Sequence, residues 1–268
     1  FIELKLTRFE IPVLLMFSTL GMLIMICSNN LMVMYLAIEL QSLSLYVLAT
    51  IKRDSLHSAE SGVKYFVLGA LSSGILLYGF TLIYGFTGST SFENIYLTIG
   101  KLDNLNLGLI FGLVFVLVGL AFKVSAVPFH MWTPDVYEGA PTSITAFFAI
   151  VPKIAAIAII FRFCLEPFGN FYNEWSQIII FLSIASMFLG AIAAIAQNNI
   201  KRLLAYSSIG HVGYVLIALA AANDEGIKAV VIYMFIYMIM NIAIFALLLS
   251  LKSSNGFVEK IDELSGLS

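Results

Sequence analysis

Charged residues are scarce in this sequence, and their scarcity excludes most soluble folds. Only 11% of the 268 residues are Asp, Glu, Lys or Arg, whereas a soluble domain has about 25%. The formal net charge of -2 leaves no basic surface for nucleic acid, and no basic amphipathic segment indicates a peripheral membrane protein. Since 60% of the residues are hydrophobic, water is not the main solvent of this chain.

Cysteine clusters and nucleotide-binding motifs are lacking as well. Cys27 and Cys164 stand in apolar stretches without CxxC spacing, a pattern typical of buried thiols rather than of a disulfide or metal site. The sequence has no glycine-rich nucleotide loop. A haem between His130 and His211 is disfavoured because each lies near the end of an apolar stretch and no second histidine pair exists. We therefore expect neither a metal nor a cofactor in this chain.

Long apolar runs are what the sequence has instead. A helix needs roughly 20 apolar residues to cross a bilayer, and the sequence contains about eight such runs. They lie at 11–28, 31–51, 62–86, 107–130, 142–165, 176–196, 208–222 and 228–251. The strands of a membrane barrel would alternate over about ten residues instead. The predicted fold is an all-α, polytopic transmembrane helical bundle.

Charges in the loops predict the orientation of this bundle. One side collects Lys5, Arg8, Lys52, Arg53, Lys201, Arg202, Lys252 and Lys260. The other side combines Lys101 and Arg162 with Glu93, Asp103, Glu166, Glu174, Asp224 and Glu225. By the positive-inside rule, the first side and both ends of the chain face the bacterial cytoplasm or the mitochondrial matrix. Because the sequence starts at Phe1 rather than Met and lacks a signal-peptide layout, we expect a segment of a longer chain.

Three charged residues stand deep inside the predicted spans: Glu39, Lys123 and Lys153. Each costs roughly 2.5–3.5 kcal/mol at the middle of a membrane, even on lenient insertion scales. One interpretation is a static salt bridge that fixes the register of the helices, but buried ion pairs stabilise proteins poorly compared with apolar packing. The alternative is a path for protons or other ions, which we favour.

Two prolines lie within a turn or two of the buried lysines. Pro128 leaves the Val124 carbonyl without its usual donor, and Pro152 does the same for Phe148. Transporters place their sites at such broken helices, where the open backbone lines a cavity or is buried in protein. We expect non-ideal helical backbone at both prolines, with a broken helix at Pro128. A plain kink at each is the other interpretation.

Further polar residues could extend a proton path. His130 and His211 are candidate relays because a histidine exchanges protons near neutral pH, and Lys64 either extends to the membrane surface or joins the charged residues. One polar stripe contains Tyr35, Glu39, Ser42 and Tyr46, and a second contains Tyr233, Tyr237 and Asn241. Interhelical hydrogen bonds alone would also explain the second stripe. We expect Glu39 and Lys123 to face each other between the second and fourth spans.

Two runs of the sequence resemble a known family. Residues 122–141 read FKVSAVPFHMWTPDVYEGAP, and residues 201–214 read KRLLAYSSIGHVGY. Both resemble the antiporter-like membrane subunits of respiratory complex I, the proton-translocating NADH:quinone oxidoreductase. The first run is most similar to the N-type chain, subunit 2. The resemblance covers nearly the whole segment and corresponds to family helices four to eleven.

The resemblance implies an internal repeat and a set of proton-relay residues. In that family two inverted five-helix repeats build two half-channels. The first repeat would be complete here, at 1–165, and the second partial, at 176–251. The relay glutamate of the family matches Glu39, and its two lysines match Lys123 and Lys153. A further lysine, on the family's twelfth helix, has no counterpart in this sequence.

The resemblance also implies a function, partners and a location. The chain would translocate protons in the bacterial or mitochondrial inner membrane, beside other membrane-arm subunits that include further antiporter-like chains. NADH, FMN, iron–sulfur clusters and quinone would be bound by partner subunits, which carry out the electron transfer. Two alternatives stay open: a subunit of a multi-subunit Na+/H+ antiporter, and a membrane scaffold with static ion pairs.

Overall fold

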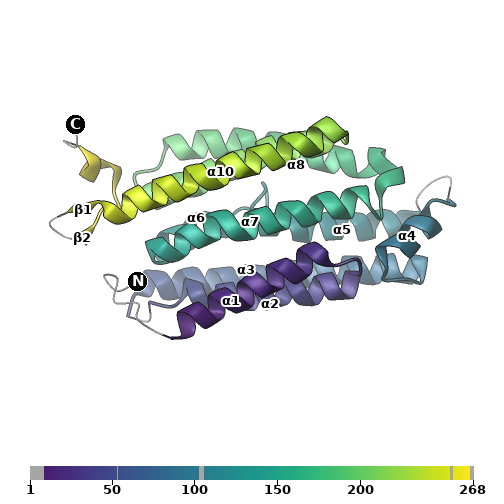
Figure 1. Ribbon diagram of the computed structural model, residues 1–268, viewed down its shortest axis with the longest axis horizontal. Helices are drawn as coiled ribbons and strands as arrows, with labels where there is room; N and C mark the ends of the chain where they lie inside the picture. The colour runs from purple at the N-terminus through teal and green to yellow at the C-terminus, as the bar shows by residue number, and fades with distance from the viewer. Residues whose placement is uncertain (1–8, 53, 103–105, 254–255, 266–268) are drawn as a thin grey trace.

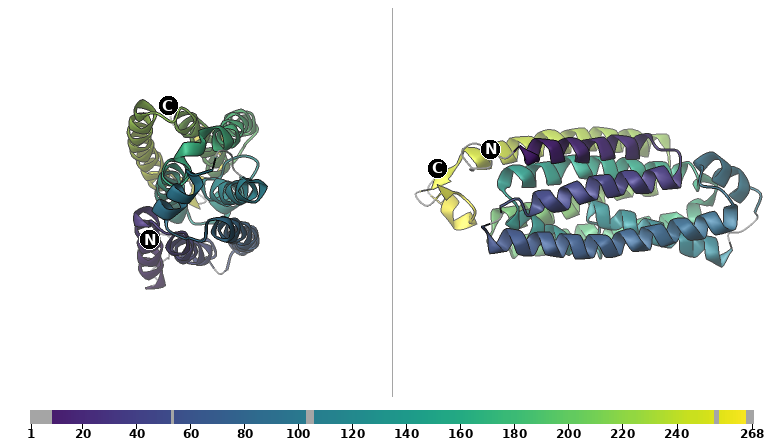
Figure 2. Two further views of the ribbon diagram at one scale, coloured as in Figure 1. Left: turned by 90° about the vertical axis from the view of Figure 1, so that its right-hand side faces the viewer. Right: turned by 90° about the horizontal axis from the view of Figure 1, so that it is seen from below.

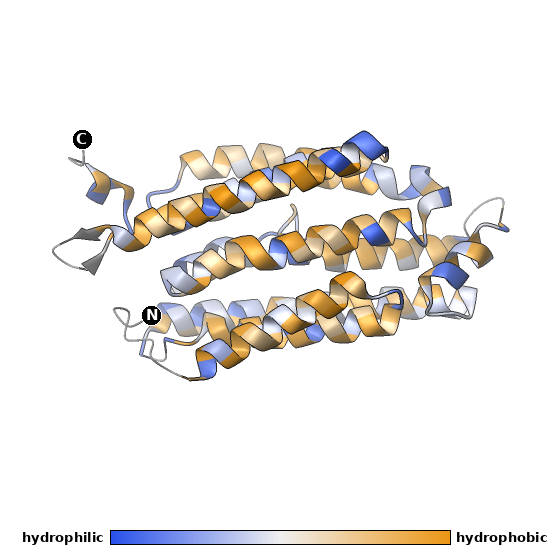
Figure 3. Cartoon of the chain, in the orientation of Figure 1, coloured by the Kyte–Doolittle hydropathy of each residue, from blue (hydrophilic) through white to orange (hydrophobic). Residues whose placement is uncertain are grey.

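The computed structural model describes residues 9–52, 54–102, 106–253 and 256–265. Within these residues, eight helices are long and apolar enough to cross a membrane. They lie side by side along the long axis of the molecule (Figure 1). Apolar residues cover most of their length, and polar residues gather toward the ends (Figure 3). The prediction of an all-α transmembrane bundle is confirmed.

The long helices run alternately up and down the bundle. They are α1 (Glu10–Cys27), α2 (Leu31–Ala49), α3 (Leu56–Thr87), α5 (Leu107–Val124), α7 (Thr142–Leu165), α8 (Tyr172–Ile195), α9 (Ile200–Ala220) and α10 (Asp224–Ser250). The shorter elements are α4 (Phe92–Ile99), α6 (Trp132–Gly139), η1 (Gly169–Phe171), η2 (Ile261–Leu264) and the two-residue strands β1 (Lys252–Ser253) and β2 (Gly256–Phe257). α5, α6 and α7 lie between α1–α3 and α8–α10 (Figures 1 and 2).

The alternation gives the bundle two chemically different ends. We call the end where α3 and α9 begin the Lys201 end, and the opposite end, where α7 stops, the Arg162 end. The Lys201 end also holds Lys52, Arg202 and Lys260, whereas acidic residues at the Arg162 end include Glu166 and Glu174. The predicted sorting of charges therefore holds for the described residues. Lys5, Arg8, Arg53 and Asp103, and the side chain of Lys252, lie outside them.

Two helices begin well before their predicted spans, because side chains cap polar first turns. α3 starts at Leu56, where the Ser55 hydroxyl accepts a bond from the Ser58 N–H at 3.4 Å. α9 starts at Ile200, where the Asn199 side chain accepts from the N–H groups of Lys201 and Arg202. Such caps satisfy backbone donors that the helix cannot pair itself. Charged residues in a first turn hide this start from a search for apolar runs.

The helix is broken at Pro128, as predicted, but not at Pro152. α5 ends at Val124, and Ser125 adopts the left-handed conformation with φ 66°. The chain turns through Pro128 before α6 begins. α7, in contrast, continues as one helix through Pro152, so there is no second break, and the expected non-ideal helical backbone at Pro152 stays a prediction. One proline removes a single backbone bond, and packing on neighbouring helices holds the rest of α7 together.

Close packing of α3 against α5 holds the first part of the broken helix. A Cβ atom added to Gly79 of α3 would lie 2.8 Å from the Val116 nitrogen and 2.9 Å from the Gly112 carbonyl oxygen of α5. Real Cβ atoms do not approach backbone this closely, so only glycine fits at Gly79. Small residues at such crossings let helix backbones approach in a membrane. α5 is therefore fixed along α3, and its last turn carries Lys123.

Two turns of the bundle have the same pattern of backbone bonds. In the α1–α2 turn, the N–H of Leu31 donates to Thr90 at 2.8 Å and the N–H of Phe92 donates to Asn29 at 3.0 Å. In the α8–α9 turn, the corresponding donors are Ile200, bonded to Glu259 at 2.9 Å, and Ile261, bonded to Asn198 at 3.0 Å. Each of the four residues in the second turn lies the same number of sequence positions after its counterpart in the first turn. The two turns lie at opposite ends of the bundle (Figure 1).

Candidate functional site

Lys123 lies in the last turn of α5, directly before the break, and its side chain points into the bundle. The residue is 8% exposed. Its ammonium group donates a hydrogen bond to the Ser42 hydroxyl of α2 at 2.8 Å, and Ser42 in turn donates to the carbonyl of Ile38 at 2.6 Å. The structure thus places Lys123 against the polar stripe of α2, although α5 itself packs mainly on α3 and α7.

Glu39 lies one helical turn before Ser42 on the same stripe. Its Oε1 atom is buried and has no hydrogen-bond partner among the described residues, and the same is true of the Tyr46 hydroxyl. Within this described part of the chain, no ion pair of 4.0 Å or less joins Glu39 to Lys123. Because residues three apart are neighbours on a helix surface, the carboxylate lies near the lysine without a direct salt bridge. The predicted facing pair is therefore not in direct contact.

Lys153 is enclosed even more completely, in the middle of α7. It is 1% exposed, and its ammonium group donates to the Ser208 hydroxyl of α9 at 2.5 Å. The same ammonium lies 5.6 Å from the ring centre of Tyr137, where a cation is attracted to the aromatic face. Among the residues described, no carboxylate lies within 4.0 Å of Lys153. Ser208 thus accepts a hydrogen bond from Lys153, as Ser42 accepts one from Lys123.

His211 lies beside Lys153 in a crevice formed by α7, α9 and α10. The two residues line this crevice together with Tyr233 and Tyr237. The Nδ1 atom of His211 lies 2.6 Å from the Tyr233 hydroxyl, and the Tyr237 hydroxyl donates to the Ala149 carbonyl of α7 at 3.0 Å. The second polar stripe therefore makes interhelical hydrogen bonds and also surrounds a protonatable group.

His130 stands apart from these contacts, in the turn after Pro128. Its Nδ1 atom is buried without a hydrogen-bond partner in the described part of the chain. Its ring centre lies 6.5 Å from that of Tyr206 on α9. The structure therefore places His130 between the broken helix and α9, but it shows no bond from His130 to either buried lysine.

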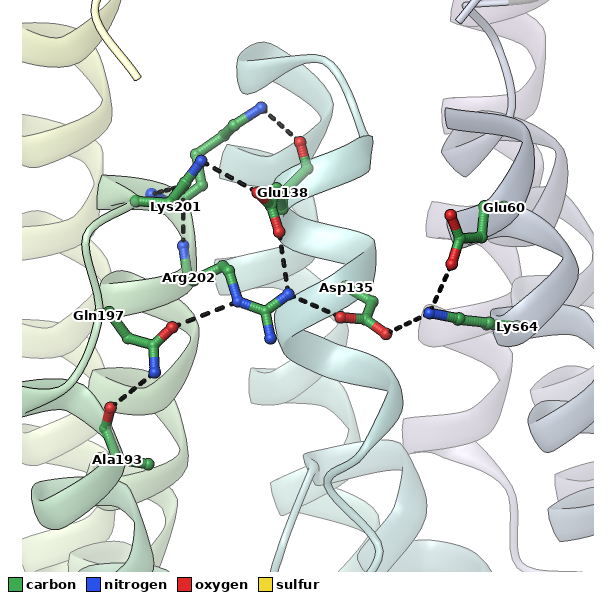
Figure 4. Close-up of polar contacts among 9 residues, drawn as sticks. Glu60, Lys64, Asp135, Glu138, Ala193, Gln197, Lys201 and Arg202 are labelled. Carbon is green, nitrogen blue, oxygen red and sulfur yellow. Dashed lines mark hydrogen bonds and ion pairs between the residues drawn. The ribbon is translucent and has the colours of Figure 1, made fainter. Parts of the chain in front are cut away.

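Lys64 belongs to a chain of ion pairs at the Lys201 end (Figure 4). Its ammonium group lies 2.8 Å from both Glu60 and Asp135. Asp135 also pairs with Arg202 at 2.7 Å, and Arg202 pairs with Glu138 at 2.9 Å. These contacts connect α3, α6 and α9. The Lys64 side chain is 44% exposed, so the structure assigns this lysine to the surface and not to the interior with Lys123.

The ion pairs border a water-accessible cavity of about 210 Å³. Its lining includes His57, Lys64, Asp135, Glu138 and Arg202. Burial by itself raises the pKa of the Asp135 carboxyl. Hydrogen bonds from Lys64 and Arg202 together lower this pKa by more than burial raises it, so that the pKa lies below its ordinary value of 3.8. Asp135 is therefore a fixed negative charge between two cations.

Lys201 binds the C-terminal end of α6. Its ammonium group donates to the Glu138 carbonyl at 2.6 Å and to the Ala140 carbonyl at 3.3 Å. These are carbonyls at the end of α6 that the helix itself does not pair. A lysine near a helix C-terminus also interacts favourably with the helix dipole. α6 is thus attached to α9 by main-chain and side-chain contacts together.

Sequence reasoning missed several residues that contact the buried lysines or form the ion pairs at the Lys201 end. Ser208 lies three positions before His211 on one face of α9, and this spacing was the available signal. Asp135 and Glu138 likewise lie three apart beside the broken helix, in a run that was read only for its resemblance. Their pairing with Lys64 and Arg202 depends on contacts between distant helices. The fold and site together define a multi-span membrane protein with protonatable groups inside its helix bundle.

Comparisons with known proteins identify the family. The family described as NADH:quinone oxidoreductase/Mrp antiporter, transmembrane, matches residues 28–268. Subunit N of the NADH-quinone oxidoreductase of Pelagibacter ubique is 60% identical over 265 residues, a match that covers 98% of this chain and 55% of that protein. The chain therefore belongs to the NADH:quinone oxidoreductase/Mrp antiporter family. It spans about half the length of the curated relatives that it matches.

Solved structures of this family have the same fold. A chain of respiratory complex I from Thermus thermophilus, solved with bound aureothin, has a TM-score of 0.78 and 36% identity, covering 93% of this chain and 53% of that one. A chain of an Mrp complex from a Dietzia species has a TM-score of 0.80 and 25% identity, covering 87% and 43%. The sequence is therefore closer to that complex I chain than to that Mrp chain.

Proposed function

We propose that this chain translocates protons across an energy-transducing membrane as part of an NADH:quinone oxidoreductase. The observation that carries this proposal is the environment of Lys123 and Lys153. Each is enclosed in the bundle and donates to a serine hydroxyl, with no carboxylate within 4.0 Å in the described part of the chain. A static scaffold would pair such charges directly, because an uncompensated charge in a membrane interior is costly.

In the proposed relay, Lys123 receives a proton, Glu39 attracts it there, and Lys153 receives it next. The buried carboxylate oxygen of Glu39 has no hydrogen-bond partner among the described residues, so it remains available to interact with a charge on Lys123 or with water. Lys153, His211 and Tyr233 line the same crevice, and the His211 Nδ1 atom lies 2.6 Å from the Tyr233 hydroxyl. Histidine and tyrosine hydroxyls are suitable groups for onward transfer. His130 is a further candidate between α5 and α9.

We propose that the Lys201 end faces the bacterial cytoplasm or the mitochondrial matrix. The positive-inside rule supports this orientation, because lysine and arginine accumulate in the loops of that side. Lys52, Lys201, Arg202 and Lys260 lie at this end. Protons would therefore enter from the Lys201 end and leave toward the Arg162 end.

We propose two inverted repeats, with 1–165 as the first and 176–251 as part of the second. Support comes from the two matching turns, which have the same backbone bonds at opposite ends of the bundle. Gly21 and Gly190 extend the match, since each lies against the same backbone positions of the following helix. At the same constant spacing, Ser42 corresponds to His211 and Glu39 to Ser208. The two residues that bind the buried lysines therefore come from related helix faces.

The partners proposed for this chain are other membrane-arm subunits, including further antiporter-like chains. Electron transfer would take place in subunits that bind NADH, FMN, iron–sulfur clusters and quinone. The names of the relatives support this assignment, since they are NADH-quinone oxidoreductase subunits N at 54–60% identity. Sodium/proton exchange has weaker support, because it rests on the 25% identity to an Mrp chain.

Purification of the full-length protein with its natural partners tests this proposal. We expect NADH- and quinone-handling subunits to co-purify, and we expect the reconstituted complex to acidify or alkalinise vesicles when NADH is added. Proton movement should not require sodium. Co-purification with antiporter chains only, together with sodium-dependent exchange in the absence of NADH, would contradict it.

A further inference from the structure

The break between α5 and α6 is bonded to a residue of α8. Ser186 lies in α8, and its side chain is 0% exposed. Its hydroxyl oxygen accepts a hydrogen bond from the backbone N–H of Val127 at 2.9 Å, across 59 positions of sequence. Val127 precedes Pro128 in the break itself. A helix of the second proposed repeat therefore contacts the broken helix of the first.

Other backbone donors of the break bond within their own segment. The N–H of Ser125 donates to the Phe122 carbonyl at 3.1 Å, and that of Ala126 donates to Ala121 at 2.9 Å. The N–H of Phe129 donates to Ala126 at 2.7 Å. Among residues 125–129, all of which the structure describes, Val127 is the donor that bonds to another helix. Its bond is the one that fixes the break relative to α8.

Side chains of the segment complete its local shape. The Thr133 hydroxyl donates to Ser125 at 2.6 Å, and both residues are 0% exposed. The Trp132 indole donates to the Phe122 carbonyl at 3.0 Å. These bonds shape the break but do not set its position against the neighbouring helices. Lys123 stands two residues before Ser125, so a displacement of the break changes where its ammonium group points.

We infer that Ser186 is a positioning residue for proton transfer. Its bond to Val127 fixes the broken segment and thereby holds the Lys123 ammonium group at Ser42. It also makes the position of Lys123 depend on α8. This inference rests on the proposed role of Lys123. The bond is not dispensable, since buried backbone N–H groups without an acceptor are rare in proteins and costly in a membrane interior.

Ser186→Ala in the assembled complex tests the inference, with Ser183→Ala as the matched control. Ser183 lies one turn earlier on α8 and is 1% exposed, but its hydroxyl donates to the Gly213 carbonyl of α9 at 2.7 Å. Each variant removes one buried hydroxyl from the same helix. Ser186→Thr keeps the acceptor oxygen and should restore wild-type behaviour. Ser186→Cys, which keeps the shape with a weaker acceptor, replaces it if threonine prevents assembly.

Two measurements distinguish positioning from a general structural role. We expect backbone amides of residues 125–131 to exchange with solvent about tenfold faster in Ser186→Ala, and we expect the pH profile of proton pumping to shift. Ser183→Ala should change neither. Equal exchange in the two variants would overturn the inference, and so would faster exchange with an unchanged pH profile. Undiminished pumping by Lys123→Met would instead overturn the proposed function, whatever Ser186 does.

Discussion

The cations in the interior of the bundle have different bonding partners from the cations at its Lys201 end. At the Lys201 end, Lys64 and Arg202 each bond to two carboxylates, with distances of 2.7–2.9 Å. In the interior, Lys123 and Lys153 each donate to one serine hydroxyl. The ion pairs at the Lys201 end lie beside a water-accessible cavity, where ion pairs form easily. The interior is where an unneutralised charge costs most.

This difference separates charges that hold the fold from charges that are available for chemistry. A lysine between two carboxylates keeps its proton, because each carboxylate favours the charged form. A lysine bound to a hydroxyl has a partner that accepts its bond in the charged state and donates to it in the neutral state. The serines therefore allow both states of the interior lysines, whereas the ion pairs at the end allow only one.

Replacing Lys153 should have the largest effect that distinguishes the two regions. In Lys153→Met the apolar stem remains, but a proton must pass without a protonatable group at mid-membrane. An unassisted charge costs roughly 2.5–3.5 kcal/mol there, so we expect proton transfer through this chain to slow about a hundredfold and the protons pumped per NADH oxidised to fall. Assembly, measured as the abundance of the complex in membranes, should be unchanged. Lost assembly would assign Lys153 to the scaffold instead.

Glu39 should have a smaller effect, through its charge. Because no ion pair of 4.0 Å or less joins Glu39 to Lys123 among the described residues, the attraction between them is below the roughly 4 kcal/mol of two charges 4 Å apart at an effective dielectric near 20. Glu39→Gln removes this attraction and should slow pumping by at least about tenfold. Glu39→Asp keeps the charge and should retain more activity. Equal rates for the two variants would contradict a role for the charge of Glu39.

Arg202→Ala should have the smallest effect on pumping and a clear effect on stability. It leaves Asp135 and Glu138 without a cation that bonds to both. For a half-buried network, we expect a loss of about 1–2 kcal/mol in the free energy of unfolding. Thermal inactivation of the complex measures this loss. Lys228→Ala breaks an exposed pair with Glu225 and should cost less than about 1 kcal/mol; a cost equal to that of Arg202→Ala would contradict the account.

Apolar length predicted the helices well, and polar helix starts were its main failure. α7 begins and ends where the sequence indicated, because Pro141 directly precedes its first residue and the charged Glu166 follows its last. The start of α9 was missed because Lys201 and Arg202 look like a loop until their partners on α6 are known. Pro152 was overestimated as a helix breaker, since local sequence does not reveal that neighbouring helices support α7.

Charges in apolar runs identified Glu39, Lys123 and Lys153 as candidates, but not their partners. An insertion cost is a property of one residue and its depth, so it can be read from sequence. The choice of Ser42 and Ser208 as partners depends on how α2 and α9 pack around the lysines. The bond from Val127 to Ser186 also joins helices that are distant in sequence. Contacts of this kind require the folded bundle.

The central claim is that an interior lysine carries protons and an exposed lysine at the end of the bundle does not. Proteoliposomes with equal amounts of wild-type, Lys123→Met and Lys228→Met complexes test it, with proton uptake and NADH oxidation followed together. We predict that Lys123→Met lowers the ratio of protons pumped to NADH oxidised, whereas Lys228→Met keeps the wild-type ratio. Equal ratios of protons to electrons in all three complexes would contradict the claim.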